Sequence, residues 1–216
     1  KEQAINLKLF IRKNHRIINN STENMIPLEV KDNKNNFKIG IKNQKKNIIS
    51  ICRLVDQKNI FEIFEIARNL QIYNFIILGD GYLFDKARFF IKSNNIKNVY
   101  LFGKKNDVFK YLYESDLFLS TSLYEGHPIS ILEAMSIGLP IVASKVTGNI
   151  DTIKDNYSGL FYKLGDINQA VYCIQRIMND NSLKSKISFN AFSSHRKLFT
   201  TNKMKKSYLS LYKKFN

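Results

Sequence analysis

Short apolar runs and amphipathic stretches follow one another along most of the chain. The apolar runs have the length of buried strands and are bounded by polar residues or glycine. They predict strands at residues 47–52, 74–78, 99–102, 116–120 and 139–144, with a short sixth at 160–161. Helical spacing between them predicts helices at residues 58–70, 82–93, 107–114 and 128–137. This alternation favours an α/β fold built on a Rossmann-like, doubly wound parallel sheet.

The two ends of the chain differ from this middle part. Residues 1–14 could form a helix and 15–18 a short extended piece, whereas 19–47 are polar with no clear period, as in a linker. Extra C-terminal helices are predicted at residues 166–179, 182–192 and 204–215. We therefore expect a hinge or linker at residues 1–46, the sheet domain at 47–200 and a last helix within 201–216. The first residue is Lys1 and not methionine, which suggests a piece of a longer protein.

Composition favours a globular domain in a reducing compartment. A chain of 216 residues with 44% hydrophobic content can bury one large core. No apolar run reaches the roughly 20 residues that span a bilayer, and no signal-peptide pattern opens the chain, so we expect a cytoplasmic location. Cys52 and Cys173 each lie in an apolar pattern. We expect both to be buried as small hydrophobic residues, with no disulfide and no metal.

The net charge of +16 has two interpretations. Many lysines lie beside asparagines in polar stretches such as residues 31–46, which favours a general compositional bias. The alternative is attraction to an anionic partner, such as a sugar nucleotide, a lipid phosphate or a membrane surface. Nucleic acid is an unlikely partner, because the basic residues form no dense block and do not alternate with aromatic residues.

Two carboxylates separated by seven residues surround a predicted helix start. Glu125 follows the strand at 116–120, and Glu133 lies within the next helix. Pro128 suits the first helical turn, and Gly138 suits the left-handed position after the last turn. Because ligands of open α/β sheets bind beyond the carboxyl ends of the strands, this segment lies where a ligand is expected.

The same segment predicts an anion site beside hydroxyl acceptors. The free N–H groups of Ile129 and Ser130 lie at the positive end of the helix dipole and suit a phosphate. Glu133 is on their face of the helix, where it could accept hydrogen bonds from a diol such as a ribose. Glu125 could accept from a sugar attached to the phosphate. The alternative is that Glu125 caps the helix and Glu133 is an ordinary solvated residue.

Residues 122–140 resemble the E-x7-E signature of retaining nucleotide-sugar glycosyltransferases of family 4, which have the GT-B architecture. Other stretches carry the same resemblance. Residues 53–59 resemble the R-L-x-x-x-K-x turn of the family, and 78–81 its G-x-G. Residues 148–153 and 159–161 resemble the G-N-R-D-L-I and G-F-L stretches of capsule and lipopolysaccharide transferases. The similarity covers about residues 48–161 and implies the C-terminal, donor-binding half of a GT-B fold.

The resemblance implies a set of site residues. Arg53 and Lys58 neutralise the diphosphate, whose negative charge grows as the glycosyl bond breaks, and with Glu125 they form the expected catalytic group. The expected donor-binding residues are Gly79, Gly81, Gly103, Gly126, His127, Pro128, Ile129, Ser130 and Glu133. A helix-cap position explains His127 as well as a catalytic role would, so we do not assign it as the base. The sequence has no Asp-x-Asp pair at a strand end, so we expect no metal or other cofactor.

The implied function is transfer of a hexose, with retention, from a nucleotide sugar to a glycan or lipid-linked acceptor in cell-surface polysaccharide or lipopolysaccharide synthesis. The acceptor-binding N-terminal domain would be supplied in cis or by a partner chain, with residues 1–46 as its remnant. For the helix at 204–215 we favour core packing. Contact of its basic face with an anionic membrane, at the inner face of the cytoplasmic membrane, is the alternative.

Two other classes of function remain open. A catalytically inactive nucleotide-sugar-binding module would keep the phosphate site without transfer. A nucleotide-sugar epimerase or a sugar phosphorylase of GT-B architecture would also place a phosphate at a helix start. The E-x7-E pattern argues against both.

Overall fold

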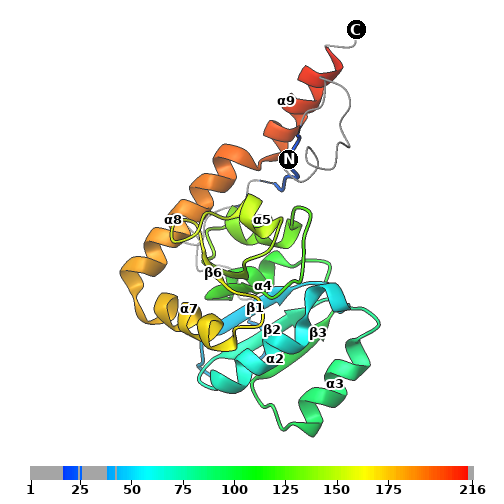
Figure 1. Cartoon of the computed structure of the whole chain (residues 1–216), viewed down its shortest axis with the longest axis vertical. Helices are drawn as coiled ribbons and strands as arrows, with labels where there is room; N and C mark the ends of the chain where they lie inside the picture. Colours follow the sequence, from blue (N-terminus) through cyan, green and yellow to red (C-terminus); the bar gives the residue numbers. More distant parts are fainter. Residues whose placement is uncertain (1–16, 24, 26–37, 42, 214–216) are drawn as a thin grey trace.

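The computed structural model describes residues 17–23, 25, 38–41 and 43–213. The helix expected at 1–14 and most of the expected linker lie outside these residues. The described part consists of an α/β body from which the last helix projects (Figure 1).

Within the described residues, six strands form one parallel sheet in the order β3-β2-β1-β4-β5-β6. Their bounds are Asn47–Ile51 for β1, Asn74–Leu78 for β2, Val99–Gly103 for β3, Leu117–Ser120 for β4, Ile141–Ser144 for β5 and Leu160–Tyr162 for β6. The order reverses direction between β1 and β4, as in a doubly wound sheet. The predicted fold class is therefore confirmed, and each predicted strand is present to within two residues at either end.

Helices cover both faces of the sheet (Figure 1). On one face, α2, α3 and α7 contribute to one apolar cluster, and on the other α4 and α5 contribute to a second, while α8 reaches both. These helices span Ile60–Asn69 (α2), Phe84–Ser93 (α3), Phe109–Tyr113 (α4), Ile129–Ser136 (α5), Ile167–Asn179 (α7) and Asn181–Leu198 (α8). Two short helices, η2 (Asp56–Lys58) and α6 (Asn149–Thr152), follow the carboxyl ends of β1 and β5.

The structure corrects several predicted helix bounds. The predicted helix at 58–70 is divided, because Asn59 adopts a left-handed conformation between η2 and α2. Pro128 is the N-cap of α5 and not part of its first turn. Helix α6 was not predicted. It depends on Gly148 at a φ of +84° and on the buried Asn149 side chain, which donates to Ser144 O.

Helix α8 continues six residues beyond its predicted end. Residues 193–198 have no clear apolar stripe, but His195 is fully buried and occupies a core position there. Its Nε2 is joined to Thr22 Oγ1 by a hydrogen bond of 2.7 Å, and burial lowers the pKa of His195 to about 4. The described start of the chain is thus attached to the end of α8.

Helix α9 (Thr201–Tyr212) projects from the body, and Thr22 forms a parallel bridge with Thr200 at its base (Figure 1). No residue of this helix is buried. Within the described residues Thr201–Tyr212 does not pack into the core, because the helix extends past the sheet and its covering layers, and packing against an acceptor-binding domain stays a prediction. Among the described helices, none combines the length and the apolar character needed to cross a bilayer.

Candidate functional site

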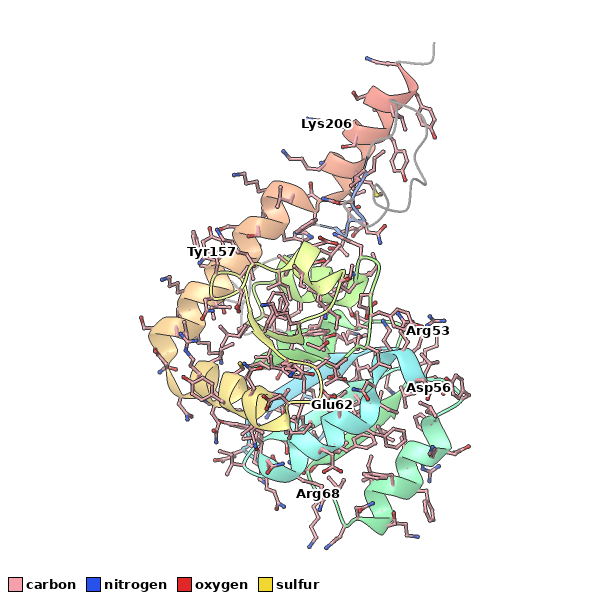
Figure 2. The ribbon with its side chains drawn as sticks, viewed as in Figure 1. Arg53, Asp56, Glu62, Arg68, Tyr157 and Lys206 are labelled. Carbon is pink, nitrogen blue, oxygen red and sulfur yellow. The ribbon has the colours of Figure 1, made fainter. Side chains whose placement is uncertain are left out.

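The loops that follow β1 and β4 meet where the strand order reverses. Because β1 and β4 are neighbours in the sheet, their carboxyl ends place residues 52–58 beside residues 121–128. Figure 2 shows Arg53 and Asp56 on the same side of the molecule, at this edge of the sheet. The predicted cationic turn and the predicted carboxylate segment therefore lie together.

An ion pair joins the two loops. Lys58 Nζ lies 2.5 Å from Glu125 Oε1, and the Ser122 hydroxyl donates to the same oxygen at 2.6 Å. The two ionic side chains are only 15% and 9% exposed, respectively. Within the described residues, no hydrogen bond reaches the second oxygen of Glu125. This arrangement holds one carboxylate oxygen and leaves the other for a ligand.

Backbone contacts continue the connection between these loops. The Thr121 hydroxyl donates to Lys58 O at 2.9 Å, and Leu123 N donates to Gln57 O at 2.8 Å. The Gln57 side chain in turn donates to Tyr124 O at 2.9 Å. The sequence alone does not single out Ser122 or Gln57 as site residues. A hydroxyl three residues before Glu125 was the available signal for Ser122, whereas nothing in the pattern indicated Gln57.

A third loop supports Glu125 from the carboxyl end of β5. Glu125 N donates to Thr147 O at 3.2 Å. A Cβ added to Gly148 would lie 2.5 Å from Glu125 O and 2.7 Å from Gly126 O, so only glycine permits this approach. Gly126 itself has open space where its Cβ would lie.

Arg53 is a cation at this edge whose side chain no described residue engages. It is exposed, and among the described residues no hydrogen bond or ion pair engages its guanidinium. Lys58, five residues later, is already paired with Glu125. A ligand anion would therefore meet Arg53 without displacing an internal contact.

The N-terminus of α5 faces the same place. The N–H groups of its first turn, including those of Ile129 and Ser130, have no intrahelical partners, and the N-cap residue Pro128 gives them no side-chain hydrogen bond. Ser130 lines a small cavity with Cys52, Lys58 and Glu125. The volume of this cavity, about 10 Å³, suits one water molecule. The helix dipole adds positive potential there.

Glu133 lies on α5 one turn beyond Ser130. Its side chain is half-buried, and burial raises the pKa of its carboxyl above the ordinary value. Within the described residues, no hydrogen bond to this carboxylate is found. The structure thus places the second carboxylate of the pair on the predicted helix, partly desolvated and without a donor.

His127 is turned toward the base of α9. Its ring lies 5.3 Å, centroid to centroid, from that of Phe199, and burial lowers its pKa. Among the described residues neither ring nitrogen has a hydrogen-bond partner. Its carbonyl oxygen accepts a hydrogen bond of 3.1 Å from Asn20 Nδ2. His127 therefore links the loop before α5 to the described start of the chain.

The predicted glycines differ in their surroundings. Added Cβ atoms would lie 1.8 Å from Cys52 O at Gly79 and 2.4 Å from Leu54 O at Gly81. These two glycines let the loop after β2 pack against the turn that carries Arg53. Gly103, at the end of β3, has a φ of +67° and open space around it. A donor contact at these three positions stays a prediction.

The described residues hold no group of three or more His, Cys, Asp or Glu side chains that could bind a metal. Cys52, beside the ion pair, is a free thiol whose pKa burial raises to about 12, although Lys58 opposes the shift. Cys52 is therefore protonated at neutral pH and unsuited to act as a nucleophile. The prediction that no metal takes part stays a prediction.

Comparison with protein families adds an independent finding. The model of the family described as "Glycosyl transferases group 1" matches residues 31–194. This range includes the whole sheet and both loops of the site.

Two curated relatives are similar over much of this chain. The UDP-Gal:alpha-D-GlcNAc-diphosphoundecaprenol alpha-1,3-galactosyltransferase of Escherichia coli is 33% identical over 153 residues, which are 67% of this chain and 40% of that protein. The poly(ribitol-phosphate) alpha-N-acetylglucosaminyltransferase of Staphylococcus aureus is 29% identical over 78% of this chain and 35% of that protein. The chain therefore spans less than half the length of these relatives.

Solved structures share the fold. A structure of S. aureus TarM, in complex with fondaparinux, alpha-GlcNAc-glycerol and UDP, superposes with a TM-score of 0.81 and 25% identity over 98% of this chain and 42% of that chain. Sucrose-phosphate synthase from Thermosynechococcus elongatus gives a TM-score of 0.84 at 19% identity, over 99% of this chain and 56% of that one, which establishes the fold alone. The expected GT-B type of architecture is confirmed for the described sheet and helices.

Proposed function

This chain belongs to the glycosyl transferases group 1 family, and we propose that it forms the donor-binding part of a retaining glycosyltransferase. The reaction would move a hexose from a nucleotide diphosphate sugar to a glycan or lipid-linked acceptor in cell-surface polysaccharide synthesis. The observation that carries this proposal is the Lys58–Glu125 pair, held beside the free Arg53 and the uncapped start of α5.

Each part of this site would serve one part of the donor. Arg53 and the first-turn N–H groups of α5 would bind the diphosphate, and Arg53 suits this because guanidinium can grip two oxygens at once. The free oxygen of Glu125 would accept a hydrogen bond from a hexose hydroxyl. Glu133, which has no donor in the described structure, would accept from the ribose.

The chemistry follows from where charge develops. As the bond between the hexose anomeric carbon and the diphosphate oxygen breaks, its electron pair moves onto the leaving diphosphate. Fixed positive groups stabilise that charge without reorganising. The acceptor hydroxyl oxygen would then form the new bond on the face from which the diphosphate leaves and would pass its proton to a diphosphate oxygen, which gives retention.

We propose uridine diphosphate as the donor nucleotide. The name of the E. coli relative specifies UDP-Gal, and the TarM structure contains UDP. The acceptor-binding half would be supplied in cis or by a partner chain, because this chain matches 40% of the first relative and 35% of the second.

Isothermal titration of the chain with UDP, UDP-galactose, UDP-N-acetylglucosamine and GDP-mannose tests the donor assignment. We expect saturable heat with UDP and at least one UDP-sugar, and none with free galactose as a control. Negligible heat with every nucleotide would contradict the proposal. Binding to a UDP-sugar with no transfer after the acceptor half is restored would favour a binding module in place of an enzyme.

Helix α9 supports a proposed peripheral contact with the inner face of the cytoplasmic membrane. Tyr208, Leu209 and Tyr212 are exposed on it, and the helix carries three lysines and no acidic residue. Such a helix suits an anionic bilayer surface. Co-sedimentation with phosphatidylcholine vesicles, with and without phosphatidylglycerol, should give binding only to the anionic vesicles.

A charge-reversal pair sharpens this membrane test. Lys205→Glu with Lys206→Glu on α9 should abolish vesicle binding. The matched pair Lys186→Glu with Lys197→Glu, at exposed positions of α8, should retain most of it. Equal binding by both doubly substituted proteins would contradict a role for α9.

A further inference from the structure

Gln57 contacts the loop that carries Glu125 through both its backbone and its side chain. Its carbonyl oxygen accepts from Leu123 N at 2.8 Å, and its side-chain Nε2 donates to Tyr124 O at 2.9 Å. Lys58, the next residue, carries the ion pair to Glu125. Successive residues of η2 thus contact successive residues of the opposite loop.

The peptide plane between Tyr124 and Glu125 is held at both of its polar ends. Its carbonyl oxygen accepts from Gln57, and its N–H donates to Thr147 O at 3.2 Å. A peptide unit is rigid and planar, so two hydrogen bonds on opposite sides fix its orientation. That orientation sets the direction in which the Glu125 side chain leaves the backbone.

The turn that carries Gln57 is itself firmly placed. Tyr82 Oη donates to the Asp56 carboxylate and accepts from Asp56 N at 3.1 Å. Leu54 N donates to Asp80 O at 3.0 Å, and Thr121 Oγ1 donates to Lys58 O. Gln57 therefore connects the Glu125 loop to a fixed support and not to a loose surface segment.

We propose that Gln57 is a positioning residue, which holds Glu125 in register with the cationic turn so that one carboxylate oxygen faces the hexose. This inference rests on the proposed function. It assigns Gln57 no contact with the donor, and it depends only on the N–H that the side-chain amide donates to Tyr124 O. Removing the amide would leave the Tyr124 carbonyl to water at the exposed loop surface, so folding would change little, while the peptide before Glu125 would lose one of the two hydrogen bonds that fix its orientation.

Gln57→Met tests this role, because methionine has nearly the same length and no N–H donor. Titration of wild type and variant with UDP and UDP-galactose compares the two ligands directly. We expect the affinity for UDP-galactose to fall about tenfold or more, the value of one charge-assisted hydrogen bond. The affinity for UDP, which lacks the hexose, should change less than about twofold. Gln175→Met, at an exposed position of α7, is the matched control and should change neither.

Gln57→Ala and thermal melting distinguish positioning from general support. Both Gln57 variants should melt within about 2 °C of wild type, as expected for loss of one half-exposed hydrogen bond. Equal losses of UDP and UDP-galactose affinity, unchanged affinities, or a large fall in Tm would each overturn the proposed role. Wild type that binds neither UDP nor UDP-galactose would refute the proposed donor and the role of Gln57 with it, whereas the proposed function falls only if every nucleotide fails to bind.

Discussion

Glu125 and Glu133 are separated by seven residues, yet the protein treats the two carboxylates differently. Glu125 is held by Lys58, by Ser122 and by the backbone of the loop after β5. Glu133 is half-buried on α5, and within the described residues it accepts no hydrogen bond. The first carboxylate is positioned before a ligand arrives, whereas the second has lost solvation that no described residue replaces with a hydrogen bond. Changes around Glu125 should therefore affect folding and geometry, and changes at Glu133 should affect pH dependence.

The largest effect is expected where backbone packs against the Glu125 loop. Gly148→Ala would place a Cβ 2.5 Å from Glu125 O at a φ of +84°, so the loop must shift. Backbone strain and overpacking together should lower the free energy of unfolding by about 3 kcal/mol or more. Chemical denaturation measures this loss.

Gly165→Ala is the matched control for this substitution. Gly165 has the same φ of +84°, but nothing lies within 4 Å of its added Cβ. Gly165→Ala should lower the free energy of unfolding by only about 1 kcal/mol, because alanine adopts a left-handed backbone less readily than glycine. Equal losses of unfolding free energy for Gly148→Ala and Gly165→Ala would show that the backbone of Glu125 and Gly126 can move to accept a Cβ at position 148.

Breaking the ion pair should have the next largest effect. Lys58→Ala leaves the 9%-exposed Glu125 carboxylate without its cation, and we expect a loss of about 2–3 kcal/mol in unfolding free energy. Lys58→Met combined with Glu125→Leu removes both charges and should recover much of that stability. Denaturation of Lys58→Met, Glu125→Leu and the double variant measures the coupling energy of the pair. If the losses of unfolding free energy in the two single variants add up to the loss in the double variant, the pair is not coupled and Glu125 is held by its other contacts.

Arg53 should behave in the opposite way from Lys58. It is exposed and unengaged within the described residues, so Arg53→Ala should leave the Tm unchanged to within about 2 °C. The free energy with which Arg53→Ala binds UDP should be weaker than that of wild type by about 1.5–3 kcal/mol, the value of a hydrogen bond to a charged group. Calorimetry with UDP measures this effect. Arg68→Ala, on the exposed surface of α2, should bind UDP as wild type does. If Arg53→Ala and Arg68→Ala bind UDP equally well, Arg53 is not part of the site.

The sheet could be predicted from the sequence because its strands are buried. Strand β2, Asn74–Leu78, is buried at every position, its residues 75–78 form one apolar run, and it has the bounds that were predicted. Parallel strands covered on both faces have this pattern in general. The loops at the ligand edge followed from that prediction, since the carboxyl ends of parallel strands share one edge.

Other features depend on contacts between residues far apart in the chain. Gln57 and Tyr124 are 67 residues apart, as are Lys58 and Glu125, and no local pattern announces either contact. Helix α6 has four residues and depends on a glycine conformation and on one buried amide, too little for a helical period. Residues 193–198 of α8 lie beyond the predicted helix, and the buried His195 that holds them to the core is a contact that no apolar stripe indicates.

The smallest effect is expected from Glu133→Gln, and it should depend on pH. Burial raises the pKa of the Glu133 carboxyl in the folded state. Its protonation therefore contributes stability that is fully present below the unfolded-state pKa and is lost as pH rises through the folded-state pKa. At neutral pH the variant avoids a partly desolvated charge and should melt about 1–2 °C above wild type. Near pH 4 this difference should shrink, because wild type is then largely protonated too. A difference in Tm between Glu133→Gln and wild type that stays constant with pH would mean that burial does not shift the titration of Glu133.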